Sequence, residues 1–347
     1  MKLYKYILLF FFILNSAFLF AQEPESSKVK WMSLTEAMEK VKKEPRPILL
    51  DFYTDWCGWC KQMMKTTYAD VNLASYINTY FYPAKFNAES KDTIEYLGKK
   101  YGPMSMDPKS PHELAVTLLS GKLMYPTTLF LSGYDKEKNS FALNMIAAGY
   151  LDIIKIQPIL IYALENVYRN STIDDFTNEF NKANNDSSID KKMEAMKWLK
   201  PITAFADSSL KKRKTIVFIN TQWCNSCKVM KRTSFTDSLN NDYFKSFFDC
   251  IDFDAETLDT INFKGQQFIN PHTPQQNLHQ LSLAFTKTTF TVPTIIFLDE
   301  HMNYLDAVPG YLPPVLLNEI SHFYGDDGYK KKPWIDYYKE AEEKRKK

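Results

Sequence analysis

The stretch Asp51-Phe-Tyr-Thr-Asp-Trp-Cys57-Gly-Trp-Cys60-Lys61 is where the fold of this 347-residue chain can be read most directly. A second stretch, Phe218-Ile-Asn-Thr-Gln-Trp-Cys224-Asn-Ser-Cys227-Lys228, has the same form. Each stretch continues a mostly apolar run, 47–50 or 214–217, which predicts a buried strand. A strand that leads directly into a helix beginning at a Cys-x-x-Cys pair is typical of a dithiol site.

The two stretches belong to a tandem duplication. Adding 167 to a residue number carries Trp31 onto Trp198 and His112 onto His279. The offset falls to 161 after the Pro-Thr at 126–127, and the six lost residues lie in the polar turn 133–140. One offset kept across many chemically matched positions indicates two copies of one domain. We expect a first domain at 23–184, a linker at 185–189 and a second domain at 190–347.

Residues 1–21 are expected to be a secretory signal peptide. Lys2 and Lys5 precede an apolar run at 7–19, and Ala21 offers a small residue for cleavage. The alternative is an uncleaved anchor, but the run is shorter than the roughly 20 residues that span a membrane. We therefore expect an exported protein of the periplasm or cell envelope. Lys and Arg (43) nearly balance Asp and Glu (41), so nothing in the charge favours nucleic acid.

Five cysteines in an exported chain predict disulfide chemistry. A disulfide across so short a loop stabilises the fold little, so reactivity is the better explanation for the two pairs. Four thiolates could also hold zinc, but the pairs lie in separate copies, and no metal site is expected. For the single Cys250, a buried inert thiol is favoured over a regulatory one. For His112 and His279, packing at a helix start is favoured over proton transfer.

Periodicity and turn residues predict the same element order in both domains. In the first domain the expected elements are a helix at 30–42, a strand at 47–54, a helix from Cys57, a strand at 81–86, helices at 93–101 and 112–119, a hairpin of 127–132 with 142–148, and a helix at 153–168.

This order, with Trp-Cys-x-x-Cys-Lys and a later Pro-Thr before a hairpin, resembles the thioredoxin superfamily over both copies. The resemblance implies an α/β fold of two tandem thioredoxin-like domains, each a mixed central sheet flanked by helices. It also implies cis peptide bonds at Tyr125-Pro126 and Val292-Pro293, beside the dithiols. The 39 residues from Asn87 to Pro126 are many more than in small thioredoxins. We expect this insertion, which recurs in the second copy, to affect substrate choice.

A cysteine at a helix N-terminus has a lowered thiol pKa, because unsatisfied N–H groups and the positive end of the helix dipole stabilise the thiolate. Cys57 would therefore attack a disulfide and Cys60 would resolve the mixed disulfide. Cys224 and Cys227 would have these roles in the second domain. The residues expected to contact substrate are Trp56, Trp59, Tyr125 and Pro126 in the first domain, and Trp223, Val292 and Pro293 in the second.

The resemblance implies that Asp51 is a buried proton acceptor for the resolving thiol and that Lys85 approaches it. The alternative is a strand-end carboxylate that reaches solvent. In the second copy Phe218 and Asp252 stand at these positions, so the base is missing and the cation has become an anion. Phe218 is expected to be a plain core residue. We expect the first domain to be the more active one.

The expected function is an exported thiol–disulfide oxidoreductase of the reductase or isomerase type, without a bound cofactor. Its partners would be exported proteins with thiols or disulfides, and the resemblance implies a membrane thiol reductant as the electron source. The alternative is a non-catalytic or redox-relay scaffold of the cell envelope that uses thioredoxin folds for binding.

Overall fold

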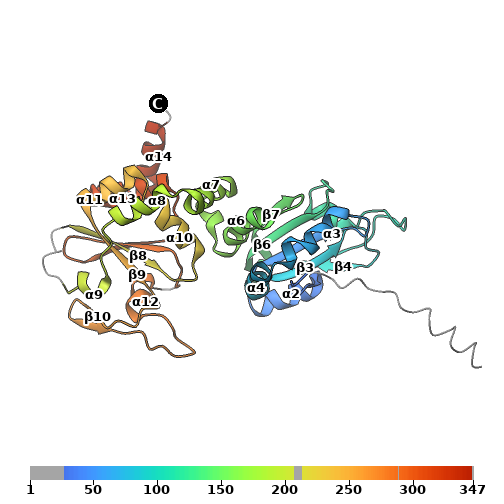
Figure 1. Ribbon diagram of the computed structural model, residues 1–347, viewed down its shortest axis with the longest axis horizontal. Helices are drawn as coiled ribbons and strands as arrows, with labels where there is room; N and C mark the ends of the chain where they lie inside the picture. Colours follow the sequence, from blue (N-terminus) through green and yellow to red (C-terminus); the bar gives the residue numbers. More distant parts are fainter. Residues whose placement is uncertain (1–26, 207–212, 288, 346–347) are drawn as a thin grey trace, which may run out of the picture. The chain divides into compact units, whose positions relative to one another are not determined.

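The computed structural model describes residues 27–206, 213–287 and 289–345. They form two mixed sheets, each with helices packed against it (Figure 1). The described chain divides into two compact units. One holds the residues up to Leu129 together with Met145–Ile153, and the other holds Phe130–Asn144 and the residues from Ile154 onward. The predicted signal peptide lies outside the described residues.

The first sheet has five strands in the order β1-β3-β2-β6-β7. The strands are β1 Met32–Ser33, β2 Ile48–Tyr53, β3 Tyr82–Asn87, β6 Thr127–Asp135 and β7 Ser140–Ala148. β3 is parallel to both β1 and β2. All of β2 except Tyr53 is buried, which explains its unbroken apolar run, since a strand covered on both faces has no solvent side. The predicted strands at 47–54 and 81–86 and the hairpin are confirmed.

Helices α2 Leu34–Lys43 and α4 Val71–Tyr80 pack on this sheet. The prediction of a helix from residue 30 was wrong by four residues. Met32 and Ser33 pair with β3, and Ser33 caps α2 by accepting a hydrogen bond from the Glu36 amide. Sequence periodicity did not predict α4, which follows α3 Gly58–Lys65 and the short turn η1 Thr67–Ala69.

The predicted helix at 93–101 is wrong. This segment is a hairpin of β4 Ile94–Tyr96 and β5 Lys99–Tyr101. Leu97 and Gly98 both have positive φ, at 51° and 83°, and such a two-residue turn matches the twist of paired strands. The second copy has the same hairpin, β10 Ile261–Phe263 with β11 Gln266–Phe268, around Lys264 and Gly265.

The rest of the first copy is helical. α5 Glu113–Leu118 confirms the predicted helix at 112–119, with His112 as its N-cap. The expected helix at 153–168 is α6 Ile153–Leu164, followed by η2 Val167–Arg169. Asn166 interrupts it in the left-handed region, at φ 55°. Two further helices follow, α7 Ile173–Asn185 and α8 Ser188–Ala195.

The second sheet has the order β13-β12-β8-β9. Its strands are β8 Lys214–Asn220, β9 Phe248–Asp254, β12 Thr294–Leu298 and β13 Tyr304–Pro309. Helices α11 Ser238–Phe247 and α13 Pro314–Gly325 lie on one side, and α9 Pro201–Ala204 and α12 Gln280–Thr286 on the other (Figure 1). The remaining elements are α10 Asn225–Arg232, η4 Gly328–Lys330 and α14 Trp334–Arg345.

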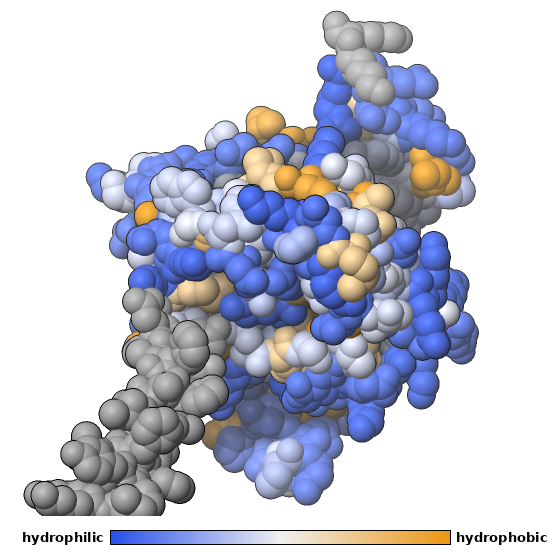
Figure 2. Space-filling view, turned by 90° about the vertical axis from the view of Figure 1, so that its right-hand side faces the viewer, coloured by the Kyte–Doolittle hydropathy of each residue, from blue (hydrophilic) through white to orange (hydrophobic). Residues whose placement is uncertain are grey.

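The surface shown in Figure 2 is mainly hydrophilic, with apolar residues confined to small patches. Isolated apolar residues of this kind are normal on a folded domain. Over the described ranges, no helix has both the length and the apolar character needed to cross a membrane.

Candidate active sites at two dithiols

The first dithiol lies at the start of α3. Cys57 is the N-cap residue, and its sulfur accepts a hydrogen bond from the Cys60 amide over 3.1 Å. The two cysteines form a disulfide, and each is only 4% exposed. The helix start predicted from the sequence therefore brings backbone N–H groups to the sulfur, the arrangement that favours a thiolate after reduction.

Asp51 lies on β2, the strand that leads to this helix, and it is fully buried. Neither carboxylate oxygen has a hydrogen-bond partner among the described residues. Loss of hydration raises the pKa of Asp51 to about 7, although the charge of Lys85 acts in the opposite direction. Lys85 is its register neighbour on β3, with Nζ 4.6 Å from the Tyr53 ring centroid. The alternative of a solvent-reaching carboxylate does not hold; the role of Asp51 as a base stays a prediction.

Two exposed tryptophans flank the first dithiol. Trp56 is 61% exposed and Trp59 64%. The Trp56 indole donates a hydrogen bond to the Glu89 carboxylate over 3.0 Å, and its ring lies 6.2 Å from that of Tyr125. The peptide bond before Pro126 is cis, as predicted. An open pocket of about 580 Å³ beside the helix start is lined by Gly58, Trp59, Gln62 and Tyr150. The rings of Trp56, Trp59 and Tyr125 are thus at least partly exposed to a peptide, whereas Pro126 is buried, and the role of all four residues stays a prediction.

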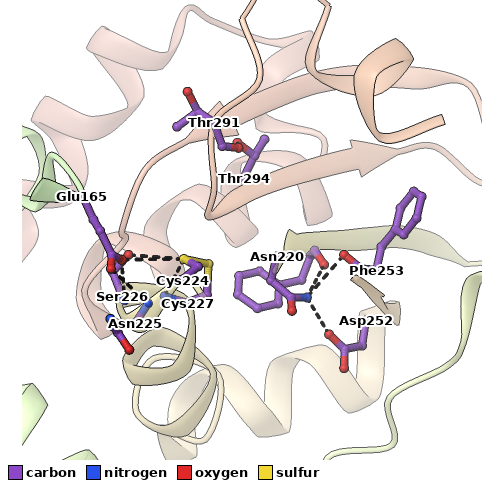
Figure 3. Close-up of a disulfide and its surroundings, with 11 residues drawn as sticks. Glu165, Asn220, Cys224, Asn225, Ser226, Cys227, Asp252, Phe253, Thr291 and Thr294 are labelled. Carbon is purple, nitrogen blue, oxygen red and sulfur yellow. Dashed lines mark hydrogen bonds between the residues drawn. A yellow bond between two sulfur atoms is a disulfide. The ribbon is translucent and has the colours of Figure 1, made fainter. Parts of the chain in front are cut away.

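The second dithiol, drawn in Figure 3, has the same helix-start hydrogen bond as the first. Cys224 is the N-cap of α10, its sulfur accepts a hydrogen bond from the Cys227 amide over 3.1 Å, and the pair is a disulfide. Trp223 is half exposed and the Val292-Pro293 bond is cis, as predicted. Cys224 itself has no exposed surface.

No carboxylate occupies the strand position corresponding to Asp51. Phe218 is fully buried there and packs against Trp198 and Phe235, so its prediction as a core residue is confirmed. Asp252, at the position of Lys85, accepts a hydrogen bond from the Asn220 side chain over 2.8 Å and forms an ion pair with Lys231. Its negative charge is therefore balanced locally.

Glu165 is a site residue that sequence reasoning missed. Its Oε1 accepts a hydrogen bond from the Asn225 amide over 3.0 Å, and its Oε2 accepts one from the Ser226 amide over 2.7 Å. Oε2 also lies 3.7 Å from Cys224 Sγ (Figure 3). Burial raises the pKa of Glu165, while these hydrogen bonds lower it. No local motif identifies the residue, because it precedes Cys224 by 59 positions and follows a helix assigned to the first domain.

The other candidate groups have structural roles. His112 and His279 are buried N-caps whose Nδ1 atoms accept backbone hydrogen bonds from Leu114 and Leu281, which confirms the packing interpretation. Cys250 is a buried free thiol, and burial raises its pKa well above the usual range, as expected of an inert cysteine. The described residues contain no group of three or more His, Cys, Asp or Glu side chains placed to hold a metal ion.

Comparison with known proteins agrees with this geometry. Residues 13–148 match the family model Thioredox_DsbH, described as a protein of unknown function, DUF255. Residues 203–324 match the model Thioredoxin_2, described as a thioredoxin-like domain. No curated protein matches the chain. With one matched model on each sheet, the chain belongs to the thioredoxin superfamily and carries two thioredoxin-like regions in tandem, as the sequence predicted.

Several solved structures are similar to parts of the chain. A thioredoxin from Thermus thermophilus is 16% identical, with 38% of this chain and 85% of that chain covered and a TM-score of 0.27. A thioredoxin-fold protein from Helicobacter pylori is 18% identical, with 45% and 92% covered and a TM-score of 0.31. A DsbH oxidoreductase is 20% identical, with 37% and 79% covered and a TM-score of 0.24.

Proposed function

We propose that this protein is an exported thiol–disulfide oxidoreductase of the reductase or isomerase type, with the first dithiol the more active of its two. The observation that carries the proposal is Asp51, a fully buried carboxylate without a hydrogen-bond partner among the described residues, on the strand that leads into the Cys57–Cys60 helix. An ionised carboxylate without a partner destabilises a protein core, and binding a proton removes that charge. Buried titratable groups of this kind concentrate at functional sites.

The chemistry follows from these groups. The Cys57 thiolate attacks a substrate disulfide, forming a mixed disulfide and releasing one substrate thiolate. Asp51, with a pKa of about 7, takes the proton of the Cys60 thiol. The Cys60 thiolate then attacks Cys57 Sγ, closing the Cys57–Cys60 disulfide and releasing the second substrate thiolate. Two electrons pass to the substrate. One product thiolate takes the Cys60 proton from Asp51, and the other takes from solvent the proton that Cys57 lost when it ionised.

Continued reduction requires an external thiol that reduces the Cys57–Cys60 disulfide again. The signal-peptide pattern of residues 1–21 supports export, so we propose a membrane thiol reductant as this donor and exported proteins as substrates. The exposed Trp56 and Trp59 support recognition of an apolar or extended peptide beside the sulfur.

The test is reduction of insulin disulfides by the full chain in the presence of dithiothreitol. Cys57→Ser is expected to remove most of the activity, and Cys224→Ser to leave most of it, because only the first dithiol has a buried carboxylate on the strand that leads to it. Equal losses in the two variants would refute the asymmetry. No activity in the unsubstituted chain would refute the function.

A second candidate function, a redox-relay or binding role, is favoured for the second domain alone. Cys224 has no exposed surface, and a carboxylate occupies the helix start beside it. Measured reduction potentials separate the two functions. A potential between those of thioredoxin and of protein disulfide isomerase supports catalysis, whereas a very reducing, unreactive disulfide supports a scaffold.

A further inference from the structure

We propose that Glu165, supplied by the turn after α6, is a positioning residue that accepts a hydrogen bond from the reduced Cys224 thiol and opposes its ionisation, so that the second dithiol is the slower of the two. The inference rests on the proposed oxidoreductase function and extends it to Cys224. It gives Glu165 an effect on the attacking cysteine of the second domain opposite to the one that Asp51 is proposed to have on the resolving cysteine of the first.

The carboxylate is held in place for this task. Both of its oxygens accept hydrogen bonds from backbone amides at the first two positions of α10, over 3.0 and 2.7 Å. The oxygen with the shorter bond is also the one 3.7 Å from Cys224 Sγ. Since Cys224 caps the same helix, its thiol hydrogen after reduction has an acceptor within reach. The Ser226 hydroxyl lies 3.6 Å from the same sulfur and completes a polar environment around it.

The arrangement favours one negative charge shared by the pair over two. A thiolate and a carboxylate would compete for the same helix-start amides, and two anions so close in a buried site repel strongly. The desolvation that raises the pKa of Glu165 has the same effect, because it favours a bound proton. Reduced Cys224 and Glu165 are therefore expected to lose their protons in two separate steps. Each step involves both residues, because the charge of one changes the proton affinity of the other.

The first domain provides the contrast. Residues Gly58 and Trp59 correspond to Asn225 and Ser226 in the repeat. In the part of the chain that the structure describes, no carboxylate accepts a hydrogen bond from their amides, and an open pocket lies there instead. Cys57 is therefore expected to ionise in a single step, assisted by its helix start alone.

The reaction of the second dithiol conserves atoms and charge. The Cys224 thiol gives its proton to solvent against the negative charge of Glu165, and the thiolate attacks a substrate disulfide. A Cys224–substrate disulfide forms, the substrate disulfide breaks, and the departing thiolate takes a proton from solvent. Cys227 then resolves the mixed disulfide, so two electrons pass from the dithiol to the substrate.

The test is the pH dependence of iodoacetamide alkylation at Cys224, in the full chain with Cys57→Ser, Cys60→Ser and Cys227→Ser. With Glu165 present, we expect two steps, the upper one above the ordinary thiol pKa. Glu165→Gln and Glu165→Ala should each give one step, with the midpoint lower by about one to two pH units, because the competing anion is gone. Asp174→Asn removes the same charge from an exposed position of α7 and should leave both steps unchanged.

A single, unshifted step in all variants overturns the proposal. The same holds if Asp174→Asn moves the midpoint as far as Glu165→Gln does, since the effect would then be one of net charge. Alkylation needs no turnover, so a shift seen in a chain that fails to reduce insulin supports the pair and removes only the proposed function. Circular dichroism of each variant checks the fold.

Discussion

At the scale of single residues, the two dithiols differ in where their carboxylates come from. Asp51 belongs to the strand before its own cysteines, whereas Glu165 reaches Cys224 from a distant part of the sequence. Sequence comparison of the two copies correctly showed that the strand carboxylate is absent from the second. It could not show Glu165, because a hydrogen bond between residues 60 positions apart exists only after the chain has folded.

The first residue-scale prediction concerns Asp51→Asn and stability. The pKa of Asp51 is about 7 in the folded protein and near 3.9 in an unfolded chain. Between these values the folded state binds more protons, so the free energy of unfolding of the parent protein decreases as pH rises from 4 to 7. The difference is up to about 4 kcal/mol. Asp51→Asn abolishes this decrease and should be more stable than the parent at pH 8, but not at pH 4.

Urea denaturation at the two pH values measures the effect. Asp55→Asn is the matched control, because Asp55 is exposed a few residues along the chain and its removal should leave the pH dependence unchanged. An Asp51→Asn protein that keeps the parental pH dependence would show that the carboxyl group is not the titrating group.

At the scale of elements, the insertion before the cis proline is anchored by one buried histidine. His112 Nδ1 accepts a hydrogen bond from the Leu114 amide at the start of α5, and His112 Nε2 lies 2.9 Å from the Asp92 carbonyl oxygen. The backbone amide of His112 also donates to Ala88 at the end of β3. One side chain thus connects the insertion's helix to its first loop, which explains why the same histidine recurs in the second copy.

The element-scale prediction follows from these bonds. His112→Ala should destabilise the protein by about 2–3 kcal/mol, because buried polar groups lose their partners. His112→Asn keeps the cap bond and should recover about 1 kcal/mol. Thermal unfolding measures both, and His301→Ala, at an exposed histidine, serves as the control. If the alanine and asparagine variants are equally stable, the cap bond contributes nothing.

At the scale of the whole molecule, each dithiol belongs to its own sheet and its own compact unit. Groups without shared partners have additive effects. Asp51→Asn should therefore leave the alkylation midpoint of Cys224 unchanged, and Glu165→Gln should leave the pH dependence contributed by Asp51 unchanged. The double variant, assayed by alkylation and by urea denaturation, checks both statements. A shift in either quantity beyond error would reveal coupling between the sites.

The sequence alone determined the duplication, both dithiol helix starts and the loss of the strand carboxylate at Phe218, while the cis prolines followed from the family resemblance. These features depend on local chemistry: an apolar run, a cysteine pair and a proline act on the few residues around them. Tertiary structure decided the rest. A hairpin around Leu97 and Gly98 formed in place of the expected helix, because both residues adopt positive φ. The pKa of Asp51 is raised because folding buries its side chain completely. Glu165 joined the second dithiol because folding brings the turn after α6 to the start of α10, a proximity that sequence spacing does not contain.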